Sequence, residues 1–325
     1  GRSALHCACK NGHFEVVKLL VDHGASIEGA DNHGITAVLE AAAAMSLNVV
    51  KFMEEKGSDI NVVAADGRTI LHVSAAGNSH KILDLLAKAG ANLNTRDCEG
   101  MTPLMTGTRG RHRLKAVKSL ISMAENGLDL QATDRHGNTA LHHAVDTDNF
   151  GAAKILIKAG LYPLKTNFLG HSAIQIALKR SSTRFALENL PEIDNNVGSK
   201  VQVSILNIAA YMGDEEVVTE LLKRAPEKEV QEYVNLLCDM GTPLYCAVYR
   251  GNMPIIEKLL KNGADFNLVG GPVGSPVVVA CAMGHVEAVV LFLRKGAELQ
   301  CTKFDETIMT AEEAAQYHEA VLWVL

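Results

Sequence analysis

The chain contains 325 residues, of which 47% are hydrophobic and only 5% are aromatic, and its formal net charge at pH 7 is −6. This negative charge gives no long-range attraction to nucleic acid, so we expect no nucleic-acid partner. No apolar run approaches the roughly 20 residues that cross a bilayer, and the first residues lack the order of a signal peptide, so we expect no membrane insertion.

A pattern of about 33 residues recurs from one end of the chain to the other. The hydroxyl residues that open it are Ser3, Thr36, Thr69, Thr102, Thr139, Ser172, Ser204, Thr242, Ser275 and Thr310. The glycines that close it keep the same phase and lie at Gly24, Gly57, Gly90, Gly127, Gly160, Gly263 and Gly296. A period this regular is typical of a solenoid, in which each repeat packs on its neighbours.

Each repeat predicts two helices separated by a turn. The opening Ser or Thr caps a short apolar first helix, as in residues 4–9, 70–75 and 140–145. A glycine such as Gly12 breaks the chain, and an amphipathic second helix follows, as in residues 14–25 and 253–264. The closing glycine supplies a left-handed cap. In the third repeat we expect Leu85 or Leu86 to be buried between neighbours.

Four openings carry a resemblance to a known family: "GRSALH", "GRTILH", "GNTALH" and "GMTPL". Together with the second-helix sequence that follows them, as in "NGHFEVVKLLVDHGA", they resemble the ankyrin repeat. The resemblance covers essentially the whole chain as ten repeats. It implies an all-α solenoid of stacked antiparallel helix pairs with projecting hairpin loops, and a module without an activity of its own.

The fourth repeat departs from the pattern at "GTRGRHRLKAVKSL", residues 107–120. Its basic residues form a secondary candidate site for a carboxylate-rich or phosphorylated partner segment. The alternative is a solvated loop, because charged loops are common on protein surfaces. The candidates are Arg109, Arg111, Arg113 and Lys115, with His112 and Lys118 nearby.

A larger departure spans residues 183–203, where the second helix of the sixth repeat is shortened and Pro191 interrupts the repeat pattern. We therefore expect a sub-stack at residues 1–190, an irregular junction at 191–203 and a second sub-stack at 204–325. Neither end carries a polar capping repeat, so we expect further domains in a longer chain.

Two clusters of chemically active side chains are explained by the repeat. "HCACKNGH" at residues 6–13 holds zinc-capable groups, but its histidines occupy regular repeat positions, and C-x-C on one helix lacks the usual ligand spacing. His142, His143, Asp146 and Asp148 lack a matching nucleophile. We expect no metal site, no cofactor and no catalytic residues.

Seven cysteines, an odd number, are spread along the chain without the dense spacing of a small secreted scaffold. A reducing, intracellular compartment is the expected setting, with the cytoplasm favoured and the nucleus as the alternative.

Aromatic and methionine side chains recur on the predicted first helices near the C-terminal end. Tyr and Arg are enriched at interaction hot spots, and Tyr, Met and Arg at interfaces generally, so these positions predict a binding stripe on the concave face. The alternative is that the tyrosines fill space beside the next loop. The candidates are Tyr211, Met212, Tyr245, Tyr249, Arg250, Met283 and Tyr317.

Phe168 and Leu169 occupy a predicted hairpin tip where other repeats carry polar residues. Exposed apolar tips suggest a contact, either with a partner or within the irregular sixth repeat. Together these features predict non-covalent recognition of another protein, by an adaptor, scaffold or targeting segment. The alternative is an enzyme or small-molecule receptor with a site in a cleft near residues 184–240, which an enclosed pocket would favour.

Overall fold

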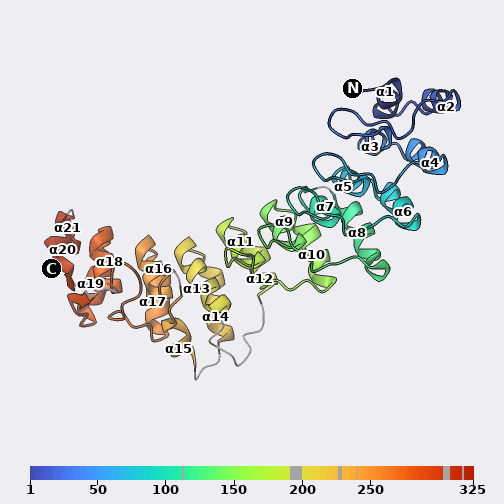
Figure 1. Cartoon of the computed structure of the whole chain (residues 1–325). Helices are drawn as coiled ribbons and strands as arrows, with labels where there is room; N and C mark the ends of the chain where they lie inside the picture. The colour runs from blue at the N-terminus through green and yellow to red at the C-terminus, as the bar shows by residue number, and fades with distance from the viewer. Residues whose placement is uncertain (112, 191–199, 226–228, 239, 303–307, 317) are drawn as a thin grey trace. The chain divides into compact units, whose positions relative to one another are not determined.

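The computed structural model describes the chain except for residues 112, 191–199, 226–228, 239, 303–307 and 317 (Figure 1). The described residues form two compact units, Gly1–Ala173 and Ile174–Leu325, here named the N-terminal and the C-terminal unit. Most of the predicted junction at 191–203 lies outside the described residues, so the division into sub-stacks there stays a prediction. No described helix combines the length and the hydropathy needed to span a bilayer.

The N-terminal unit is a stack of helix pairs (Figure 1). Successive first helices pack on one another, successive second helices do the same, and each first helix packs on its own second helix. The first helices are α1 (Ala4–Lys10), α3 (Ala37–Ala43), α5 (Ile70–Ala76), α7 (Pro103–Thr108) and α9 (Ala140–Asp146). The second helices are α2 (Phe14–Asp22), α4 (Leu47–Glu55), α6 (His80–Lys88), α8 (Leu114–Ser122), followed by the 3₁₀ turn η1 (Ala124–Asn126), and α10 (Phe150–Lys158).

The C-terminal unit is also built from helix pairs, with more irregular members. Its first helices are α11 (Ala173–Lys179, which begins at the boundary), α13 (Lys200–Met212), α16 (Pro243–Arg250), α18 (Pro276–Met283) and α20 (Ala311–Ala314). Its second helices are α12 (Thr183–Glu188), α14 (Glu215–Arg224), α17 (Met253–Lys261), α19 (Val286–Arg294) and α21 (Glu319–Leu322). An extra helix, α15 (Val230–Asn235), follows α14, and the short antiparallel strands β1 (Gln300–Thr302) and β2 (Ile308–Thr310) precede α20. The fold is otherwise helical, as the sequence predicts.

The predicted N-caps are present in most repeats. Thr102 Oγ1 accepts a hydrogen bond from Met105 N at 3.4 Å, and Thr242 Oγ1 accepts one from Tyr245 N at 3.2 Å. Thr36 and Ser275 hold the N-cap position without a side-chain capping bond. Ser204 is a further exception, because α13 begins at Lys200 and Ser204 lies inside it. The prediction of a cap there is wrong: the helix starts earlier than in the other repeats, so its first turn is formed by residues that precede the repeat pattern.

The repeat histidines join neighbouring repeats. His72 Nδ1 lies 3.2 Å from Thr69 N, which donates to it, and His72 Nε2 donates to the carbonyl of Met101 in the next hairpin at 2.9 Å. His142 makes the same pair of bonds, to Thr139 N at 3.1 Å and to the His171 carbonyl at 3.0 Å. A buried donor and a buried acceptor are therefore satisfied by one ring, which fixes the spacing between repeats.

The core lies between the helix layers of each repeat and between neighbouring repeats. Leu86 of α6 is fully buried, whereas Leu85 is partly exposed, which confirms that at least one of the pair is buried. The seven closing glycines adopt φ values between 81° and 97°, the left-handed region that a glycine enters without strain. The sequence pattern thus describes both the core positions and the helix ends.

Candidate functional site

Two tyrosines stack on the first-helix layer of the C-terminal unit. Tyr211 is the penultimate residue of α13 and Tyr249 is the penultimate residue of α16, and these two helices pack side by side. Their ring centroids lie 6.1 Å apart with an interplanar angle of 26°. The guanidinium carbon of Arg250 lies 5.2 Å from the centroid of the Tyr211 ring, within the range of a cation–π contact. Sequence positions 38 residues apart thus form one aromatic and cationic cluster.

Tyr245 differs from the expectation of an exposed contact residue. It lies one turn before Tyr249 on α16, is only 6% exposed, and stacks on Tyr249 with the centroids 6.3 Å apart. The hairpin at residues 270–274 covers it, and a Cβ atom on Gly271 would meet Tyr245 Cζ at 2.5 Å. This burial raises the pKa of the Tyr245 phenol. Tyr245 therefore supports the ring of Tyr249 from within the unit.

The remaining stripe candidates lie at different depths. Tyr249 is 38% exposed and Met212 is 40% exposed, while Tyr211 and Met283 are half-buried. Tyr317 lies outside the described residues. Tyr211, Met212, Tyr249 and Arg250 are named the tyrosine cluster below; Tyr211 is half-buried and the other three residues are exposed.

Side chains of the following repeat hold the ends of these first helices. Asn252 Nδ2 donates to the carbonyl of Ala210 at 3.0 Å, and His285 Nε2 lies 3.5 Å from the carbonyl of Tyr249. Each of the two is the N-cap residue of a second helix, α17 or α19. The sequence signal is a polar residue directly after the breaking glycine, but its inter-repeat role needed the structure. These bonds fix the backbone beneath the tyrosine cluster.

Phe168 and Leu169 form an apolar hairpin tip in the N-terminal unit. They are 77% and 75% exposed, the largest exposed fractions among the described large hydrophobic residues after Trp323. Phe168 N donates to the His136 carbonyl at 3.0 Å, and the Phe168 ring lies against the backbone of Gly137. The tip is held in place and accessible, but it belongs to a different unit from the tyrosine cluster.

The basic loop is tied to the next repeat. Arg111 Nη2 lies 2.5 Å from Asp148 Oδ2, and Arg113 Nη1 donates to the Thr106 carbonyl at 3.2 Å. Asn149 Nδ2 donates to the carbonyl of Gly110 at 2.7 Å. Arg109 and Lys115 are exposed, and His112 lies outside the described residues. Arg109 Nη1 also donates to Met101 Sδ at 3.5 Å, so three of the four candidate cations have partners within the chain.

The histidines of the two motifs make hydrogen bonds within the fold. Both ring nitrogens of His6 are engaged, by Ser3 and by the Ile35 carbonyl at 2.9 Å. His143 Nε2 lies 2.9 Å from Asp134 Oδ2, and burial lowers the pKa of His143 although this carboxylate acts in the opposite direction. No group of three or more potential metal ligands gathers among the described side chains.

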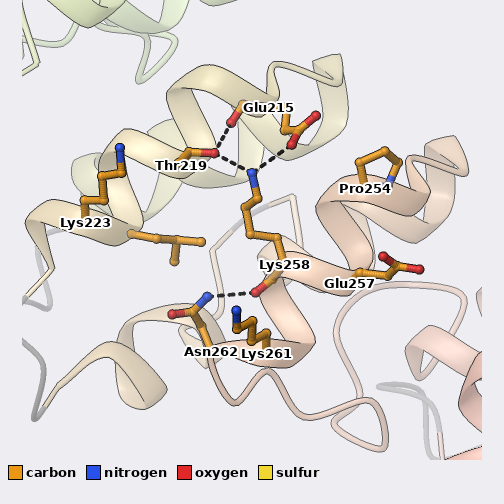
Figure 2. A pocket seen from close by; sticks show the side chains of 9 residues that line it. Glu215, Thr219, Lys223, Pro254, Glu257, Lys258, Lys261 and Asn262 are labelled. Carbon is orange, nitrogen blue, oxygen red and sulfur yellow. Dashed lines mark hydrogen bonds and ion pairs between the residues drawn. The ribbon is translucent and has the colours of Figure 1, made fainter.

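A groove of about 610 Å³ lies between α14 and α17 (Figure 2). Lys258 crosses it: its Nζ lies 2.8 Å from Glu215 Oε1 and 2.6 Å from Thr219 Oγ1. The groove overlaps the region near residues 184–240 that the alternative function would use. It is open to solvent, and the lysine at its centre is already paired.

Comparison with known proteins gives the relatives of this sequence. A family model described as ankyrin repeats (3 copies) matches residues 1–64, 48–134, 71–167 and 174–270. The chain is 27% identical over 198 residues to the transient receptor potential cation channel subfamily A member 1 of Drosophila melanogaster, matching 58% of this chain and 14% of the channel. It is 30% identical over 196 residues to a B-cell lymphoma 3 protein homolog of Mus musculus, matching 58% of this chain and 42% of that protein. The chain thus spans well under two thirds of the length of either relative.

Proposed function

The chain belongs to the ankyrin-repeat family, and from that membership we propose that it is a protein-recognition module whose C-terminal unit binds a partner through the tyrosine cluster. Repeats of this kind are generally protein-interaction modules, and the product of stacking them is an extended surface. We further propose that the module acts as an adaptor, scaffold or targeting segment of a larger intracellular protein. The small matched fractions of the two relatives and the free thiols of the described cysteines support this.

The observation that carries the proposal is the stack of Tyr211 on Tyr249 with Arg250 beside it. Stacked rings are already rigid, so little conformational entropy is lost when a partner buries them. A cation held over an aromatic face offers charge and apolar area at one place, which suits an interface anchor. The partner is expected to cover Met212 and Tyr249 together, because both are exposed at the ends of adjacent helices.

The alternative of an enzyme or a small-molecule receptor would use the groove between α14 and α17. Small-molecule sites bury most of their ligand in a concave, mostly apolar pocket with a few unpaired polar groups. This groove is open, and Lys258 is paired with Glu215 and Thr219. Recognition of a protein therefore has the stronger support.

Photo-crosslinking tests the proposed surface. A partner is first obtained by affinity purification with the chain as bait, and then purified. A photoreactive amino acid at position 212 should crosslink to the purified partner, whereas the same group at Leu19, which is 59% exposed on α2, should not. Crosslinking from position 19 but not from position 212 would place the partner elsewhere and reject the tyrosine cluster as its site.

A further inference from the structure

We propose that the second helices α6, α8 and α10 of the N-terminal unit form a docking surface for an acidic segment of a partner protein. This surface goes beyond the tyrosine cluster, since it belongs to the other unit and to the other helix layer. Its lysines, named the lysine face, are Lys81 and Lys88 of α6, Lys115 and Lys118 of α8, and Lys154 and Lys158 of α10. All six are exposed.

The structure brings these lysines into one face. Helix α8 packs against α6 on one side and against α10 on the other. Each helix has nine residues, so Lys81 and Lys115 occupy the second position of their helices, and Lys118 and Lys154 occupy the fifth. Neighbouring helices lie about 8–10 Å apart, and residues three or four apart on one helix lie about 5–6 Å apart. The positive charges therefore form a continuous array across three repeats.

The three helices themselves carry little negative charge. Asp84 is the one acidic residue in the three helices, and its Oδ1 accepts a hydrogen bond from Ser119 Oγ at 2.5 Å. None of the ion pairs found among the described residues includes Lys115 or Lys118. The second helices before them differ, because α2 carries Glu15 and Asp22 and α4 ends in two glutamates. Although the net charge of the whole chain is −6, these three helices carry a local excess of positive charge.

The chemistry of the face favours an acidic protein segment over other anions. The described large hydrophobic residues that are exposed all lie outside α6, α8 and α10, so the face has no apolar group to insert into a membrane. A long polyanion such as nucleic acid would extend beyond the lysine face and meet the net negative charge of the rest of the chain, whereas a short acidic segment would not. An extended segment advances about 3.3 Å per residue, so carboxylates at every second or third residue would match the lysine spacing.

The basic loop of the fourth repeat lies at the edge of this face. The sequence predicts Lys115 as a candidate together with Arg109, Arg111 and Arg113, but all three arginines have partners within the chain. In the proposed surface, Lys118 and the lysines of α6 and α10 take the role that the sequence analysis gives to these arginines. The sequence predicts a site centred on the loop of the fourth repeat, whereas the proposed surface extends across the three helices α6, α8 and α10.

Binding of a defined peptide tests the proposal. The probe is a fluorescein-labelled 12-residue peptide of alternating Glu and Gly, measured by fluorescence anisotropy with the whole chain in 50 mM NaCl. A peptide with Gln in place of Glu controls for non-ionic binding. We expect the Glu peptide to bind, the Gln peptide not to bind, and affinity to fall as NaCl is raised to 300 mM, because salt screens exposed charges.

A matched pair of charge reversals locates the site. Lys118→Glu should weaken binding of the Glu peptide by about five-fold or more, because it reverses a charge at the centre of the face. Lys51→Glu makes the same change at the same helix position of α4, beside acidic Glu55, and should alter affinity by less than about two-fold. Both residues are exposed, and circular dichroism checks that both variants are folded.

Three results would overturn the proposal. The first is that the Glu peptide does not bind at 50 mM NaCl. The second is that Lys118→Glu and Lys51→Glu weaken peptide binding by the same factor. The third is that the chain binds phosphatidylserine vesicles but not the peptide. The last result would assign the face to a membrane instead of an acidic protein. None of them bears on the tyrosine cluster, because the lysine face is in the N-terminal unit and the cluster is in the C-terminal unit.

Discussion

The ring of Tyr249 stacks on the ring of Tyr211 with the centroids 6.1 Å apart, although the two residues belong to different repeats. We expect Tyr211→Ala and Tyr249→Ala each to weaken partner binding by about ten-fold or more, because aromatic anchors dominate interface energies. Neither should lower the melting temperature appreciably, since Tyr211 is half-buried and Tyr249 is 38% exposed. Titration calorimetry with the purified partner measures the affinities.

The basic loop provides the comparison for the tyrosines. Neutralising Arg111 and Arg113 should mainly change the salt sensitivity and the association rate, because exposed ion pairs contribute under about 1 kcal/mol. Tyr162→Ala is the matched control, since Tyr162 is 60% exposed in the N-terminal unit. If the tyrosine variants bind like wild type while the arginine variants fail at low salt, the loop is the binding site.

Adjacent leucines on α6 should differ sharply in their contribution to stability. Leu86→Ala should lower the free energy of unfolding by about 2–5 kcal/mol, because the side chain is fully buried between repeats. Leu85→Ala should cost less than about 2 kcal/mol, because Leu85 is partly exposed. Urea denaturation measures both, and equal losses would show that the packing of α6 differs from the one described.

The hairpin over Tyr245 should tolerate no side chain at position 271. Gly271→Ala places a Cβ 2.5 Å from Tyr245 Cζ and should destabilise the C-terminal unit by about 1–3 kcal/mol. Gly29→Ala is the control, because the nearest atoms that its Cβ would meet belong to Ser26 and lie 3.7 Å away. Thermal unfolding of the single variants and of Gly271→Ala with Tyr245→Leu forms a double-mutant cycle. Purely additive losses would mean that the two residues are not in contact.

Stability of the N-terminal unit should fall between pH 7 and pH 5. Burial lowers the pKa of His72 and of His142 below their ordinary value. Below about pH 6.5 the unfolded chain binds protons that the folded histidines do not, so the stability present above that pH is lost as the pH falls toward the folded pKa. Urea denaturation at pH 7 and pH 5 measures the loss.

A variant without these two rings tests the cause of the pH effect. His72→Gln with His142→Gln should be less stable at pH 7 and should show a smaller difference between pH 7 and pH 5. The lowered pKa of Asp134, to which Asn138 N and His136 N donate, affects stability only at lower pH. An unchanged pH dependence in the double variant would assign the effect to other groups.

Thiol reactivity should separate the cysteines by burial. Cys7 and Cys98 are exposed, whereas burial raises the pKa of Cys9, Cys246 and Cys281 to about 12. At pH 8, Ellman's reagent should react rapidly with the two exposed thiols, because the thiolate is the reactive form. Replacing both exposed cysteines with Ser should remove two equivalents from the fast phase; retention of the full fast phase would contradict the described burial.

Much of the tyrosine cluster could be anticipated from sequence, but the depth of each ring could not. Tyr245 and Tyr249 lie four residues apart on one helix and have the same chemistry. The hairpin at residues 270–274 covers the first and leaves the second exposed, and its path follows from close packing of Gly270 and Gly271 against the ring. The exposure of each ring depends on which residues of another repeat cover it. The local sequence pattern around the tyrosine does not contain this information.

The sequence by itself determined the ankyrin fold, the helix pairs, most caps and the repeat histidines of this protein. Those features depend on hydrogen bonds within one repeat or with its immediate neighbour, so they recur in phase and the period reveals them. Only the tertiary structure decided that Arg111 pairs with Asp148, that Lys258 pairs with Glu215, and that the lysines of three helices form one face. These relationships join side chains from different repeats at positions that the repeat leaves variable, and their physical basis is the distance between charges in space.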